Sequence, residues 1–190
     1  MSPAITTPKQ EELDRRLGRY DALQAMSTAE DLDWVPLGAK DVIFARKIMP
    51  IILEPTKSPF GNIAPITSAG GMTMFISIMP PGQGPCLHSH NSTYETFMVL
   101  EGEVEYNIGD PIEHRRVLKK WDTISVPPRT YRGFRNVGTV DAVQLTVISG
   151  IQEGQDDVSV PQSVADELQR DYGAKVVDAC KTFVRFDPKA

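Results

Sequence analysis

Cysteine and histidine are scarce in this sequence of 190 residues, and long hydrophobic runs are missing. Its two cysteines, Cys86 and Cys180, are too few for a disulfide framework and favour a reducing compartment. No run approaches the ~20 apolar residues that a membrane-spanning helix needs, and residues 1–10 lack the apolar core of a signal peptide. We therefore expect a cytoplasmic protein without a membrane partner.

An excess of positive charge is missing as well. The chain has 20 Lys and Arg against 25 Asp and Glu, a formal net charge of −5, so a general electrostatic attraction to nucleic acid is not expected. No phosphate-binding glycine loop, paired CxxC or internal repeat is present. With 41% hydrophobic and 24% charged residues, the composition is that of a globular protein, and the length favours one domain over residues 1–190.

The two ends of the chain have helical patterns. Apolar residues recur every three or four positions from Leu13 to Met26, which predicts a helix over residues 8–25 that is either a solvated surface helix or a dimerisation arm. Residues 42–53 read as an extended segment, and seven prolines between 50 and 85 exclude long helices there. Residues 161–172 predict a second helix with Gly173 as its C-cap, followed by an ambiguous stretch over 176–186.

The middle of the chain is a series of short β-prone runs separated by turn residues, which is typical of an all-β sandwich or barrel. We therefore expect a β core over residues 70–150, an N-terminal helix and extended arm over 1–69, and a C-terminal helical extension over 151–190. The predicted strands are 72–79, 95–100, 103–108, 115–118, 123–126, 131–136 and 142–149.

Two of the three histidines, His88 and His90, are separated by one residue. On a strand this spacing points both imidazoles to the same face, and a turn after His90 would bring Glu95 beside them. Two imidazoles and one carboxylate form the facial set that binds a divalent first-row metal ion and leaves positions open. The alternative is a pair of surface histidines on an exposed strand.

The residues around these histidines resemble the cupin superfamily. Its first motif, G-x5-H-x-H-x3,4-E-x6-G, is matched in full by Gly82, His88, His90, Glu95 and Gly102. The resemblance covers residues 70–150. It implies a jelly-roll barrel of two packed antiparallel sheets around a small cavity, with flanking helices outside the motifs.

The second motif, G-x5-P-x-G-x2-H-x3-N, is matched only in part. Pro127 and Asn136 occupy their positions, while Trp121 and Arg129 replace glycines and Arg132 replaces the usual third histidine. Arginine is no practical metal ligand, so three arrangements are open. A metal ion is held by the first motif alone, Arg132 pairs with Glu95 in a metal-free pocket, or Arg132 binds a substrate carboxylate beside a metal ion.

The remaining histidine and the nearby cysteine have simpler interpretations. His114 lies in a polar stretch between two predicted strands, which favours a solvated position over a third metal ligand. Cys86 is expected to be a small buried residue rather than a ligand. Phe97 and Val99 lie two and four residues after Glu95, and Phe134 lies two residues after Arg132. On strands these side chains would point to the same inner face, so we expect them to form apolar walls of the pocket.

These patterns lead to a functional hypothesis. We expect a metal-dependent cupin that uses His88, His90 and Glu95 as ligands and acts on a small anionic molecule bound by Arg132, most consistent with a non-haem Fe(II) dioxygenase. Mn, Ni and Zn are alternative metals. A metal-assisted isomerase or lyase, a non-catalytic ligand-binding cupin and a purely structural cupin are alternative functions. The resemblance also implies a homodimer, with residues 8–53 as the segment for exchange between subunits.

Overall fold

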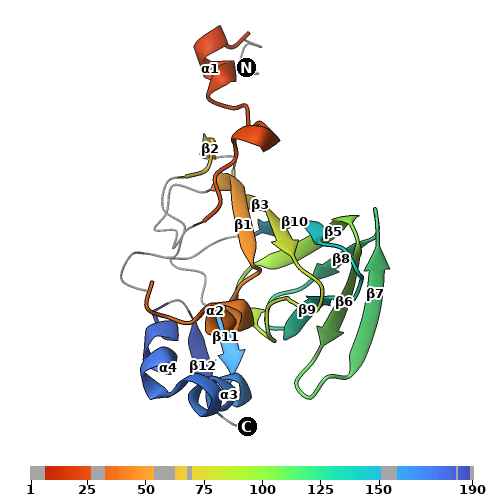
Figure 1. Cartoon of the computed structure of the whole chain (residues 1–190). Coiled ribbons are helices and arrows are strands. Elements are labelled where there is room, and N and C mark those ends of the chain that lie inside the picture. The colour runs from red at the N-terminus through yellow and green to blue at the C-terminus, as the bar shows by residue number, and fades with distance from the viewer. Residues whose placement is uncertain are drawn as a thin grey trace.

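The computed structural model of the protein describes residues 7–26, 33–53, 63–67, 70–150, 158–182 and 184–188. It confirms the all-β class, with strands at the centre and short helices towards both ends (Figure 1). The helices are α1 (Gln10–Asp14), η1 (Tyr20–Ala22), α2 (Leu37–Ile43), α3 (Gln162–Tyr172) and α4 (Ala174–Cys180). The strands are β1 (Lys47–Leu53), β2 (Ile66–Thr67), β3 (Met72–Met79), β4 (Ser89–His90), β5 (Tyr94–Glu101), β6 (Glu103–Ile108), β7 (His114–Lys119), β8 (Thr123–Val126), β9 (Arg132–Asn136), β10 (Ala142–Ser149), β11 (Val158–Pro161) and β12 (Arg185–Asp187).

One layer of the barrel is a six-stranded sheet in the order β2-β1-β3-β10-β5-β8. At its centre β10 pairs antiparallel with both β3 and β5, so that Gln144 lies opposite Ser77 on one side and Val99 on the other. The strand predicted over 72–79 is confirmed with its bounds. Its even-numbered residues share one face, which points away from the interior, because Phe75 and Met79 belong to the core.

The facing layer is the three-stranded sheet β7-β6-β9, extended by the segment 82–88. This segment runs along the free edge of β9: Phe134 N donates to Pro85 O at 3.2 Å, and Arg132 N donates to His88 O at 2.8 Å. The chain then enters β4, which pairs with β11, and β11 pairs with β12. The histidine-bearing segment is therefore held by backbone hydrogen bonds to β9 and, at β4, by pairing with β11.

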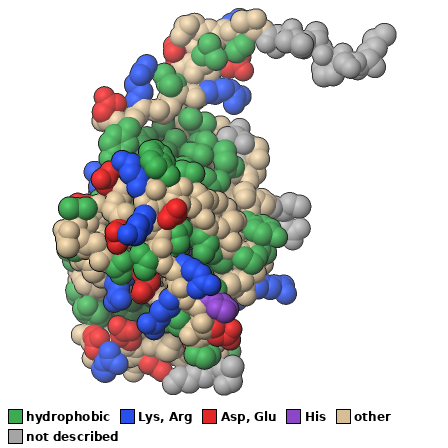
Figure 2. Space-filling view, turned by 90° about the vertical axis from the view of Figure 1, so that its right-hand side faces the viewer, with side chains coloured by type: hydrophobic (Ala, Val, Ile, Leu, Met, Phe, Trp, Pro, Cys, Tyr) green, Lys and Arg blue, Asp and Glu red, His purple; other side chains and the backbone are tan. Residues whose placement is uncertain are grey.

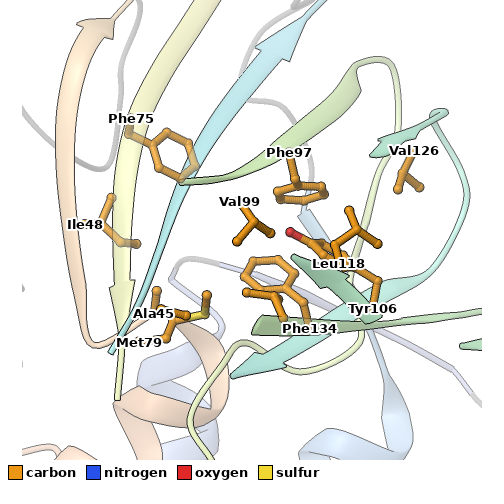
Figure 3. Close-up of a cluster of buried hydrophobic side chains, with 12 residues drawn as sticks. Ala45, Ile48, Phe75, Met79, Phe97, Val99, Tyr106, Leu118, Val126 and Phe134 are labelled. Carbon is orange, nitrogen blue, oxygen red and sulfur yellow. The ribbon is translucent and has the colours of Figure 1, made fainter. Parts of the chain in front are cut away.

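Aromatic side chains from both layers meet between the sheets (Figure 3). The ring centroid of Phe97, on β5, lies 5.3 Å from that of Tyr106 and 4.9 Å from that of Phe134, which come from β6 and β9. Full burial of a phenylalanine contributes about 1.5–3 kcal/mol, so this cluster is a main source of the attraction between the layers.

The C-terminal segment confirms the helix predicted from residue 161 to 172 and its C-cap, because α3 ends at Tyr172 and Gly173 follows as the C-cap with φ of 89°. The ambiguous stretch 176–186 divides into most of α4 and the start of β12. A second buried cluster joins these helices to α2 and β11 around Leu168, which is fully buried. None of the described helices is long and apolar enough to cross a membrane.

The N-terminal segment differs from its prediction. Where the sequence predicts one helix over 8–25, the structure has only the five residues of α1 and the three of η1, and neither contains a buried residue. Leu13, Leu17 and Tyr20 expose 47%, 47% and 60% of their surface, because the segment extends away from the barrel (Figure 1). An amphipathic helix of this length is marginal in water unless its apolar face packs against something. The segment predicted as extended over 42–53 likewise starts as the end of α2 and becomes β1 at Lys47.

Candidate metal centre

Two glycines allow the segment that carries His88 to lie directly against β9. A Cβ atom on Gly84 would lie 2.0 Å from the carbonyl oxygen of Phe134, and one on Gly133 would lie 2.9 Å from Leu87 N. The close approach lets His88 pair with Arg132 through backbone hydrogen bonds of 2.8 Å in both directions. Local backbone packing therefore fixes where the first histidine sits.

The structure brings His88, His90 and Glu95 together as the sequence predicts. Their ligand atoms all lie within 4.8 Å of one another. Oε2 of Glu95 is 3.5 Å from Nε2 of His88 and 3.6 Å from Nε2 of His90. The side chains of the two histidines and of Glu95 expose 13%, 7% and 5% of their surface, so this is an interior cluster rather than an exposed strand pair.

Arg132 forms an ion pair with Glu95, the contact on which the second of the three arrangements considered from the sequence depends, and this contact leaves the presence of a metal ion open. Its Nε and Nη2 atoms donate to the same carboxylate oxygen, Oε2, at 2.9 Å and 2.7 Å. Its Nη1 atom donates to the carbonyl oxygens of His88 at 3.4 Å and Thr130 at 3.3 Å. Arg132 is 0% exposed, so its guanidinium group is part of the interior.

The charges in the cluster follow from these contacts. Burial raises the pKa of the Glu95 carboxyl, but opposing effects, of which the charge of Arg132 is the largest, outweigh burial and hold this pKa well below its usual range. Burial lowers the pKa of His88, so its imidazole is neutral at neutral pH. Glu95 is therefore an anion beside a neutral imidazole, the protonation states that a metal ion requires.

The imidazole of His88 is also oriented as a ligand. Its Nδ1 atom lies 2.9 Å from the carbonyl oxygen of Cys86, which can only accept, so Nδ1 carries the proton and donates. The lone pair is then on Nε2, the atom that faces Glu95. A hydrogen bond from the outer ring nitrogen to a backbone carbonyl is the usual support of a metal-binding histidine.

The donor set fits a first-row divalent ion in geometry. Ligand atoms about 2.1 Å from one ion lie about 3.0 Å apart at a right angle and about 3.4 Å apart in a tetrahedron. The two nitrogen–oxygen separations of 3.5 Å and 3.6 Å are slightly longer than both values, so a bound ion of either geometry would draw the ligand atoms together by a few tenths of an ångström. In this arrangement the nitrogen lone pair of His88 faces a carboxylate anion, a pairing that a cation between the two would make favourable.

Of the three residues predicted as apolar walls, Phe134 contacts the cluster, and Phe97 and Val99 belong to the same buried core. Phe97 and Val99 are 0% exposed, and Phe134 packs edge-on to His88 with ring centroids 6.2 Å apart. Two further polar residues that the sequence interpretation did not assign lie in the same interior. The hydroxyl of Tyr106 donates to the side-chain oxygen of Gln144, and both residues are fully buried. Strand alternation from the inward-facing residues Val104 and Ala142 would have identified them.

The other residues considered from the sequence lie elsewhere. His114 is the first residue of β7 and is exposed, as expected of a solvated histidine. Cys86 packs against the second buried cluster, and burial raises the pKa of its thiol to about 12, so it stays protonated at neutral pH.

Comparisons with known proteins address the family. Residues 75–148 match the family model Cupin_2, a cupin domain. The curated "Uncharacterized protein MJ1618" of Methanocaldococcus jannaschii is 33% identical over 64 residues, which is 34% of this chain and 49% of that protein. The chain thus spans about half the length of the curated relative that it matches.

Solved structures with a similar fold include the cupin domain of Cnp3 from Schizosaccharomyces pombe. It is 17% identical with a TM-score of 0.41, covering 44% of this chain and 59% of that one. An uncharacterized conserved protein with a double-stranded beta-helix domain from Klebsiella pneumoniae is 24% identical with a TM-score of 0.41, covering 46% and 72%. The family match falls on both motifs and on strands of the two facing sheets, so residues 75–148 of this chain form a cupin domain.

Proposed function

We propose that His88, His90 and Glu95 bind one divalent metal ion, and that the barrel acts on a small anionic organic molecule. The observation that carries the proposal is the convergence of three buried ligand groups within 4.8 Å, with the imidazole of His88 neutral and correctly oriented. Burial of a carboxylate is costly unless it is paired, and Arg132 already pairs with Glu95, so the two imidazoles beside it are additional to what a structural ion pair requires.

Fe(II) is the metal that we favour, because two imidazoles and one carboxylate are the facial set of non-haem iron oxygenases and leave positions open for substrate. When bound, Fe(II) supplies dioxygen chemistry, and the finer proposal is therefore a dioxygenase-type oxidoreductase. The two histidines serve as neutral donors and Glu95 as the anionic donor. Phe97, Val99 and Phe134 are buried and would exclude bulk water from the interior side of the site. The same donors accept Mn, Ni or Zn, with which a Lewis-acid isomerase or lyase reaction is the alternative.

One observation favours a second candidate, a cupin that binds a small ligand without metal and without turnover. Oε2 of Glu95 already accepts two hydrogen bonds from Arg132, so the carboxylate is stabilised in the absence of a cation. This candidate and the metal-dependent one predict opposite metal contents for the purified protein.

The experiment is elemental analysis of the full chain purified anaerobically under reducing conditions, without added metal. Near-stoichiometric Fe, Mn, Ni or Zn is expected, with loss of the metal in His88→Ala and in Glu95→Ala. His114→Ala is the matched control, because it removes the exposed histidine of β7, and it should keep the metal. Metal-free wild-type protein would refute the metal-dependent proposal and favour the second candidate, and a metal that persists in His88→Ala would place the site elsewhere.

The proposal extends to a homodimer in the cytoplasm. The outer face of the six-stranded sheet is apolar along three paired strands, where Ile76, Leu145 and Met98 lie side by side in register. Leu145 and Met98 are half-buried rather than buried. A solvated face of an antiparallel sheet is ordinarily polar, so this face is suited to burial against another surface. The cytoplasmic location is proposed on the two free cysteines.

The N-terminal segment supplies a second apolar surface. It touches the barrel at Gly18, where an added Cβ would lie 3.2 Å from Pro65, and projects beyond that point with Leu13 and Leu17 exposed. Hydrophobic side chains gather at the foot of this arm (Figure 2). We assign a second copy of this chain as the partner, because both apolar surfaces lie on the described part of one chain and most homo-oligomers pair equal surfaces about a two-fold axis.

A further inference from the structure

Two opposite charges are buried together at the candidate metal centre. Arg132 is 0% exposed and Glu95 is 4% exposed, and the guanidinium of Arg132 donates twice to Glu95. Oε2 of Glu95 lies 3.5 Å from Nε2 of His88 and 3.6 Å from Nε2 of His90, so the charged pair adjoins both imidazoles. With both imidazoles neutral, as metal ligands must be, the described part of the site has no net charge before a metal ion enters.

The charge of Arg132 stays in place when the site is filled. Its Nη1 atom donates to the carbonyls of His88 and Thr130, and its backbone N–H and C=O are both paired with His88 at 2.8 Å. A guanidinium group does not lose its proton in proteins. The guanidinium of Arg132 is therefore held in the site by its hydrogen bonds and keeps its proton, so its positive charge remains there.

A divalent ion would then add two positive charges to a site whose described residues hold no anion besides the already paired Glu95. Burying charge without compensation is costly, and the cost falls when an anion binds beside the cation. Most cupin-type donor sets do not carry a permanent buried cation in addition to the metal ion, because a neutral third imidazole stands where this chain has Arg132.

We infer that a divalent metal ion and a small carboxylate bind to this site cooperatively, and that Arg132 causes this by neutralising Glu95 as a fixed countercharge. The inference rests on the proposed metal site and specifies its ligand class. In this account Arg132 acts through the charge of the site and does not grip the ligand, because its hydrogen bonds run to Glu95 and to backbone carbonyls. Two sites that carry opposite charges about 5 Å apart in a partly buried setting should couple by about 10- to 100-fold in affinity.

The direct test is calorimetric titration of Mn²⁺ into the metal-free full chain at about pH 7 and constant ionic strength, with and without acetate. We expect acetate to tighten Mn²⁺ binding by about 10-fold or more, and Mn²⁺ to tighten acetate binding by the same factor, since coupling is reciprocal. Acetamide, which has the same shape without the charge, should have no effect. Equal effects of acetate and acetamide would overturn the inference.

Variants of Arg132 show whether its charge acts by neutralising Glu95 or whether its side chain binds the carboxylate ligand directly. Arg132→Gln should bind Mn²⁺ more tightly than wild type in the absence of acetate and should lose most of the acetate effect, whereas Arg132→Lys should keep the effect. A direct anchor predicts instead that Arg132→Gln weakens acetate binding and leaves Mn²⁺ affinity unchanged. Arg135→Gln is the matched control, because Arg135 lies on the same strand with a side chain that is 57% exposed, and it should behave as wild type.

The outcomes distinguish this inference from the function on which it rests. Wild-type protein that binds Mn²⁺ tightly and with the same affinity in acetate would overturn the coupling and leave the metal site standing. Wild-type protein that binds no divalent ion under either condition would overturn both. The wild-type titration decides the matter even if the buried arginine proves essential for folding.

Discussion

Arg132 and Glu95 form a buried ion pair that closes one side of the candidate site. Such a pair is costly to break from one side, because removal of one partner leaves the other charge buried without compensation. The pair therefore ties the stability of the barrel to the same two residues that set the charge of the site.

Glu95→Gln should lower the free energy of unfolding by about 3–5 kcal/mol, because it leaves the guanidinium of Arg132 buried and unpaired. Urea unfolding of metal-free protein measures the change. Glu105→Gln is the control: it removes the partner of exposed Arg135, at 3.6 Å, and should change the free energy by less than about 1 kcal/mol. Equal effects of the two substitutions would show that the buried pair has no special role.

The same pair predicts a pH dependence. The pKa of Glu95 is lowered in the folded state from its ordinary value of 4.5, so the unfolded chain takes up this proton first as the pH falls. The stabilisation is complete above the unfolded pKa and declines as the pH drops below it towards the folded pKa. The difference in unfolding free energy between wild type and Glu95→Gln should therefore be constant near neutral pH and shrink below about pH 4.5. A difference that grows on acidification would contradict the assignment.

At the scale of elements, two turns adopt the left-handed backbone conformation that favours glycine, although neither has a glycine at that position. Trp121 and Arg129 stand where the second cupin motif has glycines, and both have positive φ, 73° and 59°. Both are exposed, and the N–H of Arg129 donates to the carbonyl of His90 at 2.7 Å. A side chain in this left-handed region costs about 1–2 kcal/mol, so the turn that supports His90 is strained.

Trp121→Gly and Arg129→Gly should each raise the free energy of unfolding by about 0.5–1 kcal/mol, since relief of the left-handed strain exceeds the backbone entropy cost of glycine. Thermal or urea unfolding measures the gain. Arg135→Gly, at an ordinary position of β9, is the matched control and should lower stability. Destabilisation by all three substitutions would mean that the side chains at 121 and 129 contribute more than their backbone strain costs.

The strands and the three ligands were predictable from sequence because they depend on local patterns. Alternation and turn residues located β3, β6, β8 and β10 with their bounds, and the spacing of His88, His90 and Glu95 placed them together. The direction of the β3 faces was not predictable, since both faces of that strand are largely apolar. The pairing of Arg132 was left among three arrangements, because a single sequence does not show which acceptors surround a buried guanidinium.

At the scale of the whole molecule, the N-terminal arm carries a helical sequence pattern that needs packing against another surface to form a long helix. The apolar stripe from Leu13 to Met26 is a helical signal, yet only α1 and η1 form in the single chain. Helices of this length depend on tertiary packing more than on propensity. The proposed second copy would supply that packing on the uncovered side of the arm.

Leu145→Glu should convert a dimer to a monomer, because it places a charge at the centre of the apolar outer face of the sheet. Leu13→Asp combined with Leu17→Asp should weaken the dimer as well. Arg16→Asp, which changes a charged residue of the same arm, is the control and should leave the dimer intact. Light scattering coupled to size exclusion measures the mass, and a wild-type monomer at micromolar concentration would refute the assembly.

The most direct test of the metal site is an anomalous difference map from crystals grown with Mn²⁺ and acetate. The account predicts one strong peak about 2.0–2.3 Å from Nε2 of His88, Nε2 of His90 and a carboxylate oxygen of Glu95, with Arg132 still paired to Glu95. A map without a peak at this position, with the ion pair and both imidazoles arranged as described, would contradict the claim that these three residues form a metal centre.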